Sequence, residues 1–230
     1  MMRSVVVPCF NEARRFDAAA FVALNAELTV LVVDDGSTDD TAAIAEAAGL
    51  RVLRLPYNVG KGEAVRRGLV HALDDGADVV GYLDADLSTP IAEFRRLIAN
   101  LDPGVDVVLG SRIAHLGAQI ERHPLRHYLG RMFATTASLA LGIAVYDTQC
   151  GAKVFRATSS LLTAVQAPFA SRWAFDVELL ARLLDAGVRA DAFREIPLQH
   201  WRDVDGSHLS LGGMATAARD VLKIAIRKKR

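Results

Sequence analysis

Two carboxylates one residue apart, Asp84 and Asp86, have the clearest chemical potential in this sequence. They follow Val79–Leu83, an apolar segment typical of a buried strand, and a Ser-Thr-Pro that opens a helix comes soon after. Ligand sites lie at the carboxyl ends of parallel strands, and two acids with this spacing can reach one divalent ion. Mg2+ or Mn2+ takes one or two protein carboxylates and completes its shell with water and phosphate oxygens. The pattern therefore favours a metal site for a diphosphate ligand.

Two other interpretations of this pattern remain open at this point. A D-x-D sequence is also an ordinary polar strand end, and alone it is a weak motif. The haloacid-dehalogenase phosphatases likewise have an apolar strand that ends in D-x-D, with the first Asp as nucleophile. The sequence upstream has to decide between them.

Three earlier predicted strands also end in polar groups. They are Ser4–Val7, closed by Pro8 and followed by Asn11 and Glu12; Thr29–Val33, followed by Asp34 and Asp35; and Arg51–Leu55, followed by Lys61 between Gly60 and Gly62. In nucleotide-binding α/β folds a carboxylate at such a strand end accepts hydrogen bonds from a ribose or a base. An ammonium at a helix N-terminus favours an anion. The segment around Lys61 could also be a plain Gly-containing turn, and its spacing is not that of a Walker A motif.

Strands and helices alternate along this part of the chain. A fifth predicted strand, Val105–Leu109, ends in Ser111 and Arg112. The predicted strands are largely uninterrupted apolar runs, which is typical of strands buried on both faces of a parallel sheet. The sequence therefore predicts an α/β fold with a mostly parallel central sheet flanked by helices.

Several of these stretches carry a resemblance to a known family. PCFNE, VVDDGSTDDT, NVGKGEA and DADLS, in this order, resemble the family 2 glycosyltransferases of the Rossmann-like GT-A fold. The later stretches SR, DTQCGAKVF, RWAFDVELL and W-x-x-x-x-GSHL resemble more narrowly the dolichyl- or polyprenyl-phosphate sugar synthases, the dolichyl-phosphate β-glucosyltransferase branch most of all. The phosphatase alternative weakens, since it does not expect three preceding nucleotide-type strand ends.

The resemblance implies a domain organisation and a set of site residues. It implies one GT-A domain, 1–210, with a nucleotide-sugar half, 1–112, and an acceptor half, 113–210. The helical spacing of apolar and basic residues predicts a basic amphipathic helix at 211–230. On the nucleotide side, the resemblance implies that Pro8, Asn11 and Glu12 line the pocket, that Asp35 contacts the base or ribose, and that Lys61 lies near the nucleotide. Asp84, Ala85 and Asp86 would bind the donor and its Mg2+ or Mn2+, with Asp84 facing the ribose or a metal-bound water. Gln149 would line the sugar pocket, Asp176 would face the reacting sugar, and Arg112 and Arg126 would hold the acceptor phosphate.

Composition limits the classes of partner and the cellular compartment that we expect for this protein. The 230 residues include 27 Lys and Arg and 27 Asp and Glu, so the formal net charge is zero and we expect no nucleic-acid partner. Cys9 and Cys150 have no metal-ligand spacing partner, which predicts a reduced, cytoplasmic protein. The N-terminal apolar stretch is too short for a signal peptide. The longest uncharged run, Met132–Tyr146, has 15 residues, whereas a bilayer span takes roughly 20.

Local basic clusters nevertheless predict a membrane surface as partner. Arg112, Arg122, Arg126 and Arg131 stand against one acid, Glu121, and residues 211–230 have a basic stripe opposite an apolar one. Such a basic amphipathic segment can lie on an anionic membrane; solvated helix faces and a docking helix are the alternatives. We expect peripheral association with the inner face of the membrane, and the resemblance leaves room for an integral-membrane partner.

The predicted function is an inverting transfer of a hexose from a nucleoside diphosphate sugar to a polyprenyl or dolichyl monophosphate. Glucose from UDP-glucose is favoured by the branch that the later motifs resemble. Mannose from GDP-mannose, a hydroxyl acceptor, and a non-catalytic nucleotide-sugar-binding module are the alternatives.

Overall fold

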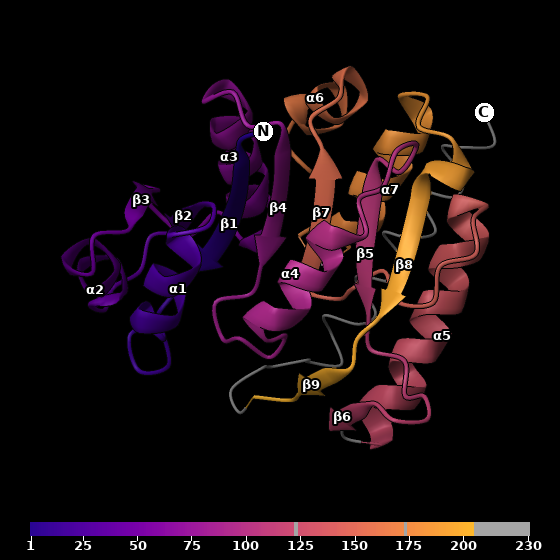
Figure 1. The fold of residues 1–230 in the computed structure, drawn as a ribbon, viewed down its shortest axis with the longest axis horizontal. Coiled ribbons are helices and arrows are strands. Elements are labelled where there is room, and N and C mark those ends of the chain that lie inside the picture. Colours follow the sequence, from indigo (N-terminus) through magenta and orange to yellow (C-terminus); the bar gives the residue numbers. More distant parts are fainter. Residues whose placement is uncertain (122–123, 173, 205–230) are drawn as a thin grey trace.

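A seven-stranded sheet in the order β3-β2-β1-β4-β7-β5-β8 forms the centre of the computed structural model (Figure 1). The model describes residues 1–121, 124–172 and 174–204, with side chains of the helix after residue 123 described from residue 133 onward. The strands are β1 (Arg3–Cys9), β2 (Thr29–Asp34), β3 (Arg51–Arg54), β4 (Val79–Leu83), β5 (Val107–Ser111), β7 (Ala152–Arg156) and β8 (Phe193–Pro197). Strand β7 runs antiparallel to β4 and β5, and the other described pairs of this sheet are parallel.

Helices cover both faces of the sheet because its strands are apolar on both sides. In β1, Val5 and Val7 pack into one core and Val6 packs into the other. The first of these cores lies under α1 (Ala18–Asn25), α2 (Thr41–Ala47) and α4 (Ile91–Ala99). The second lies under α3 (Lys61–Asp74), α5 (Pro124–Leu141), α6 (Ser159–Gln166) and α7 (Phe175–Asp185). This arrangement confirms the predicted α/β class with a mostly parallel sheet.

All five strands predicted from the sequence are present, with shifts at their ends. β1 continues through Pro8 to Cys9, whereas the sequence predicts that Pro8 closes it. The register of β1 with β4 ends at Val6, so Pro8 lies beside β2 alone, where a residue without an N–H is tolerated. β5 begins at Val107 rather than Val105, after a turn in which Val105 N donates to the Asp102 carbonyl.

The parallel strands all end at one edge of the sheet, the lower edge in Figure 1, and the antiparallel strand β7 begins at that edge. The DTQCG segment leads into β7 and so returns the chain to the sheet, as the sequence predicts. Because β7 lies between β4 and β5, its first residues sit beside the end of β4: Asp84 N donates to the Gly151 carbonyl at 3.0 Å. The same edge carries a short parallel pair, β6 (Gln119–Glu121) and β9 (His200–Arg202), and a single-turn helix, η1 (Ala190–Ala192), precedes β8 at the far edge.

Two expectations from the sequence concern the membrane. Within the described ranges, no helix combines the length and hydropathy that a bilayer crossing requires. The amphipathic helix predicted at 211–230 lies outside the described residues.

Candidate active site

The loops after β1 and β2 interlock through polar side chains. Asn11 has a positive φ of 55°, which Asn tolerates better than most residues, and its Oδ1 accepts from Thr38 N at 2.8 Å. Asn11 N donates to Ser37 Oγ at 3.0 Å, and Glu12 N donates to Thr41 Oγ1 at 2.8 Å. The predicted residues Asn11 and Glu12 thus lie in a loop that the DGSTDDT segment holds in place.

Asp35 organises the loop that carries Lys61. Its carboxylate accepts from Val59 N at 2.8 Å and from Gly60 N at 2.9 Å, and the residue is only 2% exposed. Burial raises the pKa of Asp35, while these two N–H groups and Arg172 act in the opposite direction. Gly60 has a φ of 99°, which favours glycine, and a Cβ there would lie 2.8 Å from Arg172 Nε and displace that guanidinium.

Lys61 and Asp84 form the direct contact at the centre of the site. Lys61 Nζ lies 2.6 Å from Asp84 Oδ1. Burial raises the pKa of Asp84, Lys61 lowers it and Asp86 raises it. Desolvation lowers the pKa of Lys61, but the charges of Asp84, Asp176 and Asp86 outweigh this effect and raise it. The fields of three carboxylates therefore meet at one ammonium.

The residues at the end of β4 fit a divalent cation. Asp84 and Asp86 repel each other electrostatically, as the pKa of Asp84 reflects, and a cation between them relieves that repulsion. Ala85 is buried, and Asp86 Oδ1 accepts from Ser88 N at 3.0 Å. A Cβ on Gly151 would lie 2.1 Å from Asp84 Oδ2, so the absence of a side chain there makes room for the carboxylate. Among the described residues there is no cluster of three or more His, Cys, Asp or Glu that could hold a metal.

Arg112, which directly follows β5, forms an ion pair with Asp147. Its Nε and Nη2 donate to Asp147 at 2.7 and 2.8 Å, and its guanidinium lies 5.4 Å from the ring centroid of Trp201. Desolvation lowers the pKa of Arg112, but the charge and the hydrogen bonds of Asp147, together with more distant charges, outweigh this effect and raise it. Asp147 is fixed in turn, because Glu195 Oε1 accepts from its N at 2.7 Å. Any phosphate that binds Arg112 therefore meets a guanidinium whose orientation is already set.

Asp176, in the first turn of α7, is tied to two buried groups. Lys153 Nζ donates to Asp176 Oδ1 at 2.7 Å, and Tyr82 OH also donates to Oδ1. Burial raises the pKa of Tyr82, and the Asp176 charge raises it further. Asp176 itself is 7% exposed.

Two predicted residues are placed less fully. The backbone of Arg126 lies in the first half of α5, and its side chain lies outside the described residues. Gln149 is half-buried, and its N donates to Asp147 Oδ1 at 3.2 Å. No sequence argument assigned a role to Tyr82, Asp147, Lys153 or Glu195. Two of them had a signal in the sequence: Lys153 is a charged residue within the apolar strand segment AKVF, and Asp147 is the acid that opens DTQCG.

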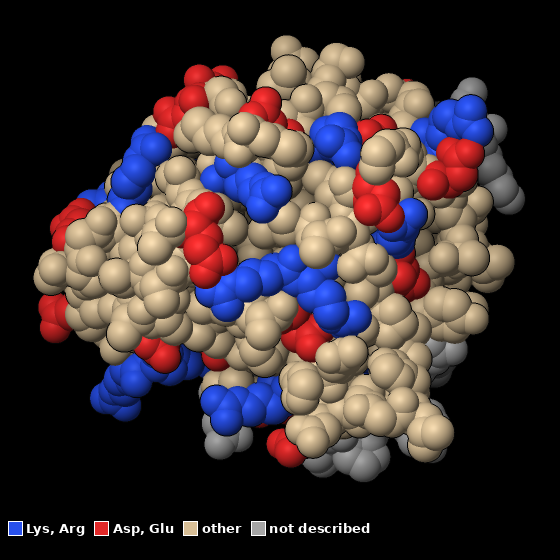
Figure 2. All heavy atoms as spheres, in the orientation of Figure 1, with Lys and Arg blue, Asp and Glu red and all other residues tan. Residues whose placement is uncertain are grey.

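Charge on the surface is mixed. In Figure 2, basic and acidic side chains are interspersed, and a band of basic side chains crosses the middle of this face. The pattern agrees with a neutral chain in which charge acts locally.

A family model described as Glycosyl transferase family 2 matches residues 4–160. Similar proteins include a dolichyl-phosphate beta-glucosyltransferase of Trichomonas vaginalis, 35% identical over 96% of this chain and 70% of that protein. The dolichyl-phosphate beta-glucosyltransferase of Drosophila melanogaster is 34% identical over 97% of this chain and 74% of its own length.

Among solved structures, the fold is similar to glucosyl-3-phosphoglycerate synthase from Mycobacterium tuberculosis in complex with Mn2+ and UDP-glucose. The TM-score is 0.74 at 25% sequence identity, over 99% of this chain and 78% of that one. The similarity covers the whole alternation of strands and helices described above.

Proposed function

Because the chain belongs to glycosyl transferase family 2, in the branch of the dolichyl- and polyprenyl-phosphate sugar synthases, we propose that it transfers glucose from UDP-glucose to a dolichyl or polyprenyl monophosphate. The chain is a metal-dependent glycosyltransferase, and the proposal concerns its donor and acceptor. The observation that carries it is similarity over 96% of the chain to a protein named dolichyl-phosphate beta-glucosyltransferase. That similarity extends past the family model, which ends at residue 160, and so covers more of the half that we assign to the acceptor, 113–210, than the family model does.

On the donor side, the loops at the carboxyl edge of β1, β2 and β3 would hold the nucleotide. We assign Pro8, Asn11 and Glu12 to the pocket wall, and Asp35 to the base or ribose, through the loop that it fixes. Lys61 would turn from Asp84 toward the diphosphate when the donor binds. Asp84 and Asp86, flanking Ala85, would hold Mg2+ or Mn2+, which supplies neutralisation of the departing diphosphate.

On the acceptor side, Arg112 and Arg126 would hold the phosphate. A phosphate monoester has a second pKa near 6, so it is already about dianionic at neutral pH. Its oxygen forms a bond to the anomeric carbon as the bond from that carbon to the UDP oxygen breaks, and the electron pair leaves with UDP. The configuration inverts, and no protein base has to remove a proton. The residues act by electrostatic preorganisation, since the two arginines offset the repulsion between nucleophile and donor.

We further propose that the reaction takes place on the cytoplasmic face of a membrane. Arg122, Arg126 and Arg131 and the basic stripe within 211–230 would contact anionic lipid, about 1 kcal/mol for each basic group near the surface, whereas Arg112 is largely buried against Asp147. Both clusters are features of the sequence. An integral-membrane partner would add a second anchor.

One assay tests donor and acceptor together. Purified protein with Mg2+ or Mn2+ and polyprenyl phosphate is supplied with radiolabelled UDP-glucose or GDP-mannose, and label in a butanol-extractable lipid is measured. We expect metal-dependent lipid labelling from UDP-glucose. Labelling from GDP-mannose instead would reassign the donor. No lipid labelling from either donor, with tight nucleotide-sugar binding intact, would overturn the phosphate acceptor in favour of a hydroxyl acceptor or a binding module.

A further inference from the structure

Lys153 is a fully buried lysine in the middle of the sheet. It lies in β7 opposite Tyr82 of β4 and Leu109 of β5, and its side chain is 0% exposed. A charged side chain is costly to bury, and apolar residues of similar volume often fill such a place at equal or lower free energy. The stability of the core therefore does not by itself explain an ammonium at this position.

The contacts of Lys153 lead to the proposed sugar end of the site. Its Nζ donates to Asp176 Oδ1 at 2.7 Å and to the Cys150 carbonyl at 2.7 Å, and it lies 5.1 Å from the centroid of the Tyr82 ring. Within the described residues, the side-chain hydrogen bonds of Asp176 that the structure gives both end on Oδ1. The Asp176 side chain remains 10% exposed, and its charge reaches Lys61 and Asp84.

The bond to the Cys150 carbonyl connects Lys153 to a second carboxylate. Cys150 precedes Gly151, whose carbonyl accepts from Asp84 N at 3.0 Å and whose missing side chain makes room for the Asp84 carboxylate. One ammonium thus contacts Asp176 directly and braces the backbone against which Asp84 rests.

We propose that Lys153 is a positioning residue of the transfer site. It holds Oδ1 of Asp176 inside the protein so that Oδ2 faces the donor hexose, and it fixes the Cys150–Gly151 backbone behind Asp84. The inference rests on the proposed function, because it requires a donor hexose beside Asp176.

The test compares Lys153→Met, Asp176→Asn and the double variant with the wild-type protein. Urea unfolding gives stability, calorimetry gives the affinities for UDP and UDP-glucose in the presence of Mn2+, and lipid labelling gives kcat/KM. Lys153→Met leaves a carboxylate buried without its partner and is expected to lose stability. The double variant removes both charges and is expected to regain most of that stability, so it remains measurable even where the single variant fails to fold.

The double variant should not regain transfer activity when it regains stability. Because a hydrogen bond from a charged donor is lost, we expect kcat/KM of the double variant to lie about ten- to a hundredfold below that of Asp176→Asn. We also expect Lys153→Met, or the double variant where the single one does not fold, to lose the affinity difference between UDP-glucose and UDP that the wild-type protein has. Equal kcat/KM in the double variant and Asp176→Asn would overturn the inference, as would an unchanged ratio of the two affinities.

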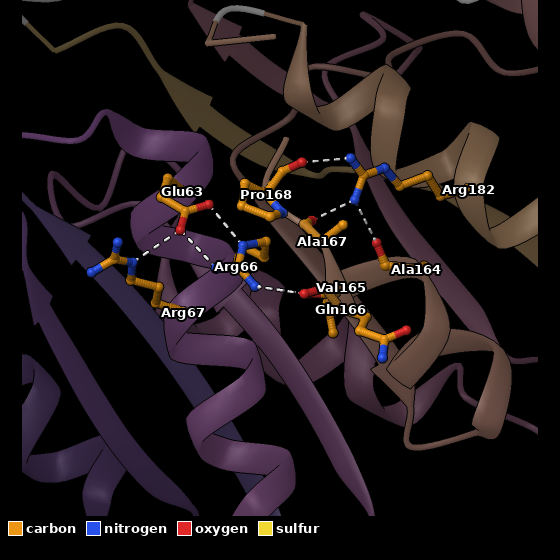
Figure 3. A network of polar contacts seen from close by, with 9 residues as sticks. All are labelled: Glu63, Arg66, Arg67, Ala164, Val165, Gln166, Ala167, Pro168 and Arg182. Atoms are coloured by element: carbon orange, nitrogen blue, oxygen red, sulfur yellow. Dashed lines mark hydrogen bonds and ion pairs between the residues drawn. The ribbon is translucent and has the colours of Figure 1, made fainter. Parts of the chain in front are cut away.

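Arg182→Met serves as the matched control. Arg182 also lies on α7 and pairs with the buried Glu178 at 2.6 Å, but its other hydrogen bonds are to carbonyls at and just after the end of α6, and its guanidinium lies over the Phe169 ring (Figure 3). It should reduce stability without changing the ratio of UDP-glucose to UDP affinity. A wild-type protein that does not bind UDP-glucose would overturn the proposed function itself, and this is read from the wild-type arm before any variant is compared.

Discussion

At the scale of single residues, three carboxylates at the sheet edge differ in what holds them. Asp84 faces Lys61, Asp86 accepts from the backbone N of Ser88, and Asp176 is bonded to Lys153 and Tyr82. Among the described residues Asp86 forms no ion pair, although its charge acts on Lys61 and Arg15. It is therefore the carboxylate best placed to bind a cation from solution.

Asp86→Asn should therefore abolish transfer. Removing a metal ligand forfeits several kcal/mol of charge stabilisation at the leaving diphosphate, so we expect a loss of at least about a hundredfold in kcat. Lipid labelling measures transfer, and titration of free Mn2+ by electron paramagnetic resonance measures metal affinity. Wild-type Mn2+ affinity and wild-type kcat in this variant would remove Asp86 from the metal site.

Asp176→Asn should reduce transfer only a few-fold, because a phosphate nucleophile needs no base and an amide oxygen still accepts a hydrogen bond. The measurement is kcat for lipid labelling beside the affinity for UDP-glucose. A complete loss of kcat in a variant that folds and binds the donor normally would indicate a catalytic base, and hence a hydroxyl acceptor.

Cys150 should be unreactive in the native protein despite its place beside Asp84. Burial, together with the charge of Asp147, raises the pKa of the thiol to about 11, and the side chain is 0% exposed. A raised thiol pKa leaves roughly a thousandth of the group as thiolate at pH 8, and the thiolate is the reactive form.

Labelling with iodoacetamide, read by mass spectrometry, checks this expectation. The native protein should stay unmodified at pH 7 to 8 and the urea-unfolded protein should react at both cysteines, since burial also raises the pKa of Cys9. Any slow native reaction should become faster as pH approaches 11. Rapid native modification of Cys150 at pH 7 would contradict the burial argument.

At the scale of elements, two arginines hold the C-terminal end of α6 against its neighbours. Arg66 of α3 donates to the Val165 carbonyl at 2.9 Å, and Arg182 of α7 donates to the Ala164, Ala167 and Pro168 carbonyls at 3.1, 2.6 and 2.7 Å (Figure 3). The last carbonyls of a helix have no partner within it, and cations there are favoured by the helix dipole. Both arginines also pair with an acid of their own helix, Glu63 and Glu178.

Arg182→Met should lower the free energy of unfolding by about 1–3 kcal/mol, because several hydrogen bonds from a charged donor are lost. Urea denaturation should show a lower midpoint with an unchanged slope. Arg189→Met is the matched control, since Arg189 pairs only with Asp191 among the described residues and its side chain is 80% exposed. Equal midpoints for the two variants would refute the role of Arg182.

Element boundaries show where local sequence stops being decisive. Ser37 followed by Asp40 has the spacing of a capping box, yet α2 begins at Thr41, with Asp40 as N-cap. Ser37 accepts instead from Asn11 N, and Asp39 accepts from Thr41 N at 3.0 Å. The loop after β1, 26 residues away in sequence, competes for the capping side chain, and that competition is invisible locally.

At the scale of the whole molecule, the loops that we propose bind the nucleotide are joined across the sheet by side chains as well as by backbone hydrogen bonds such as that from Asp35 N to the Cys9 carbonyl. Asp35 ties the end of β2 to the loop before α3, and Lys61 ties α3 to the end of β4. A ligand that contacts these loops together should stabilise the entire fold.

UDP with Mn2+ should therefore raise the unfolding temperature. At a hundredfold excess over its dissociation constant a ligand adds about 2.7 kcal/mol, which corresponds to roughly 5–10 °C for a chain of this size. Differential scanning fluorimetry measures the shift, with EDTA as the control that removes its metal-dependent part. The Asp86→Asn variant should lack that part, and a shift of equal size with EDTA would count against a metal in the donor site.

The α/β class followed from the sequence, because uninterrupted apolar runs predict strands buried on both faces and the polar residues directly after them share one sheet edge. The family followed from motifs such as VVDDGSTDDT and DADLS, whose resemblance to the family 2 glycosyltransferases is confirmed by the family model. Tertiary structure alone decided the partners of those residues. Asp176 and Lys153 are 23 residues apart, and Arg112 and Asp147 are 35 apart. They meet because β7 enters antiparallel between β4 and β5, and such long-range pairing leaves no local pattern in the sequence.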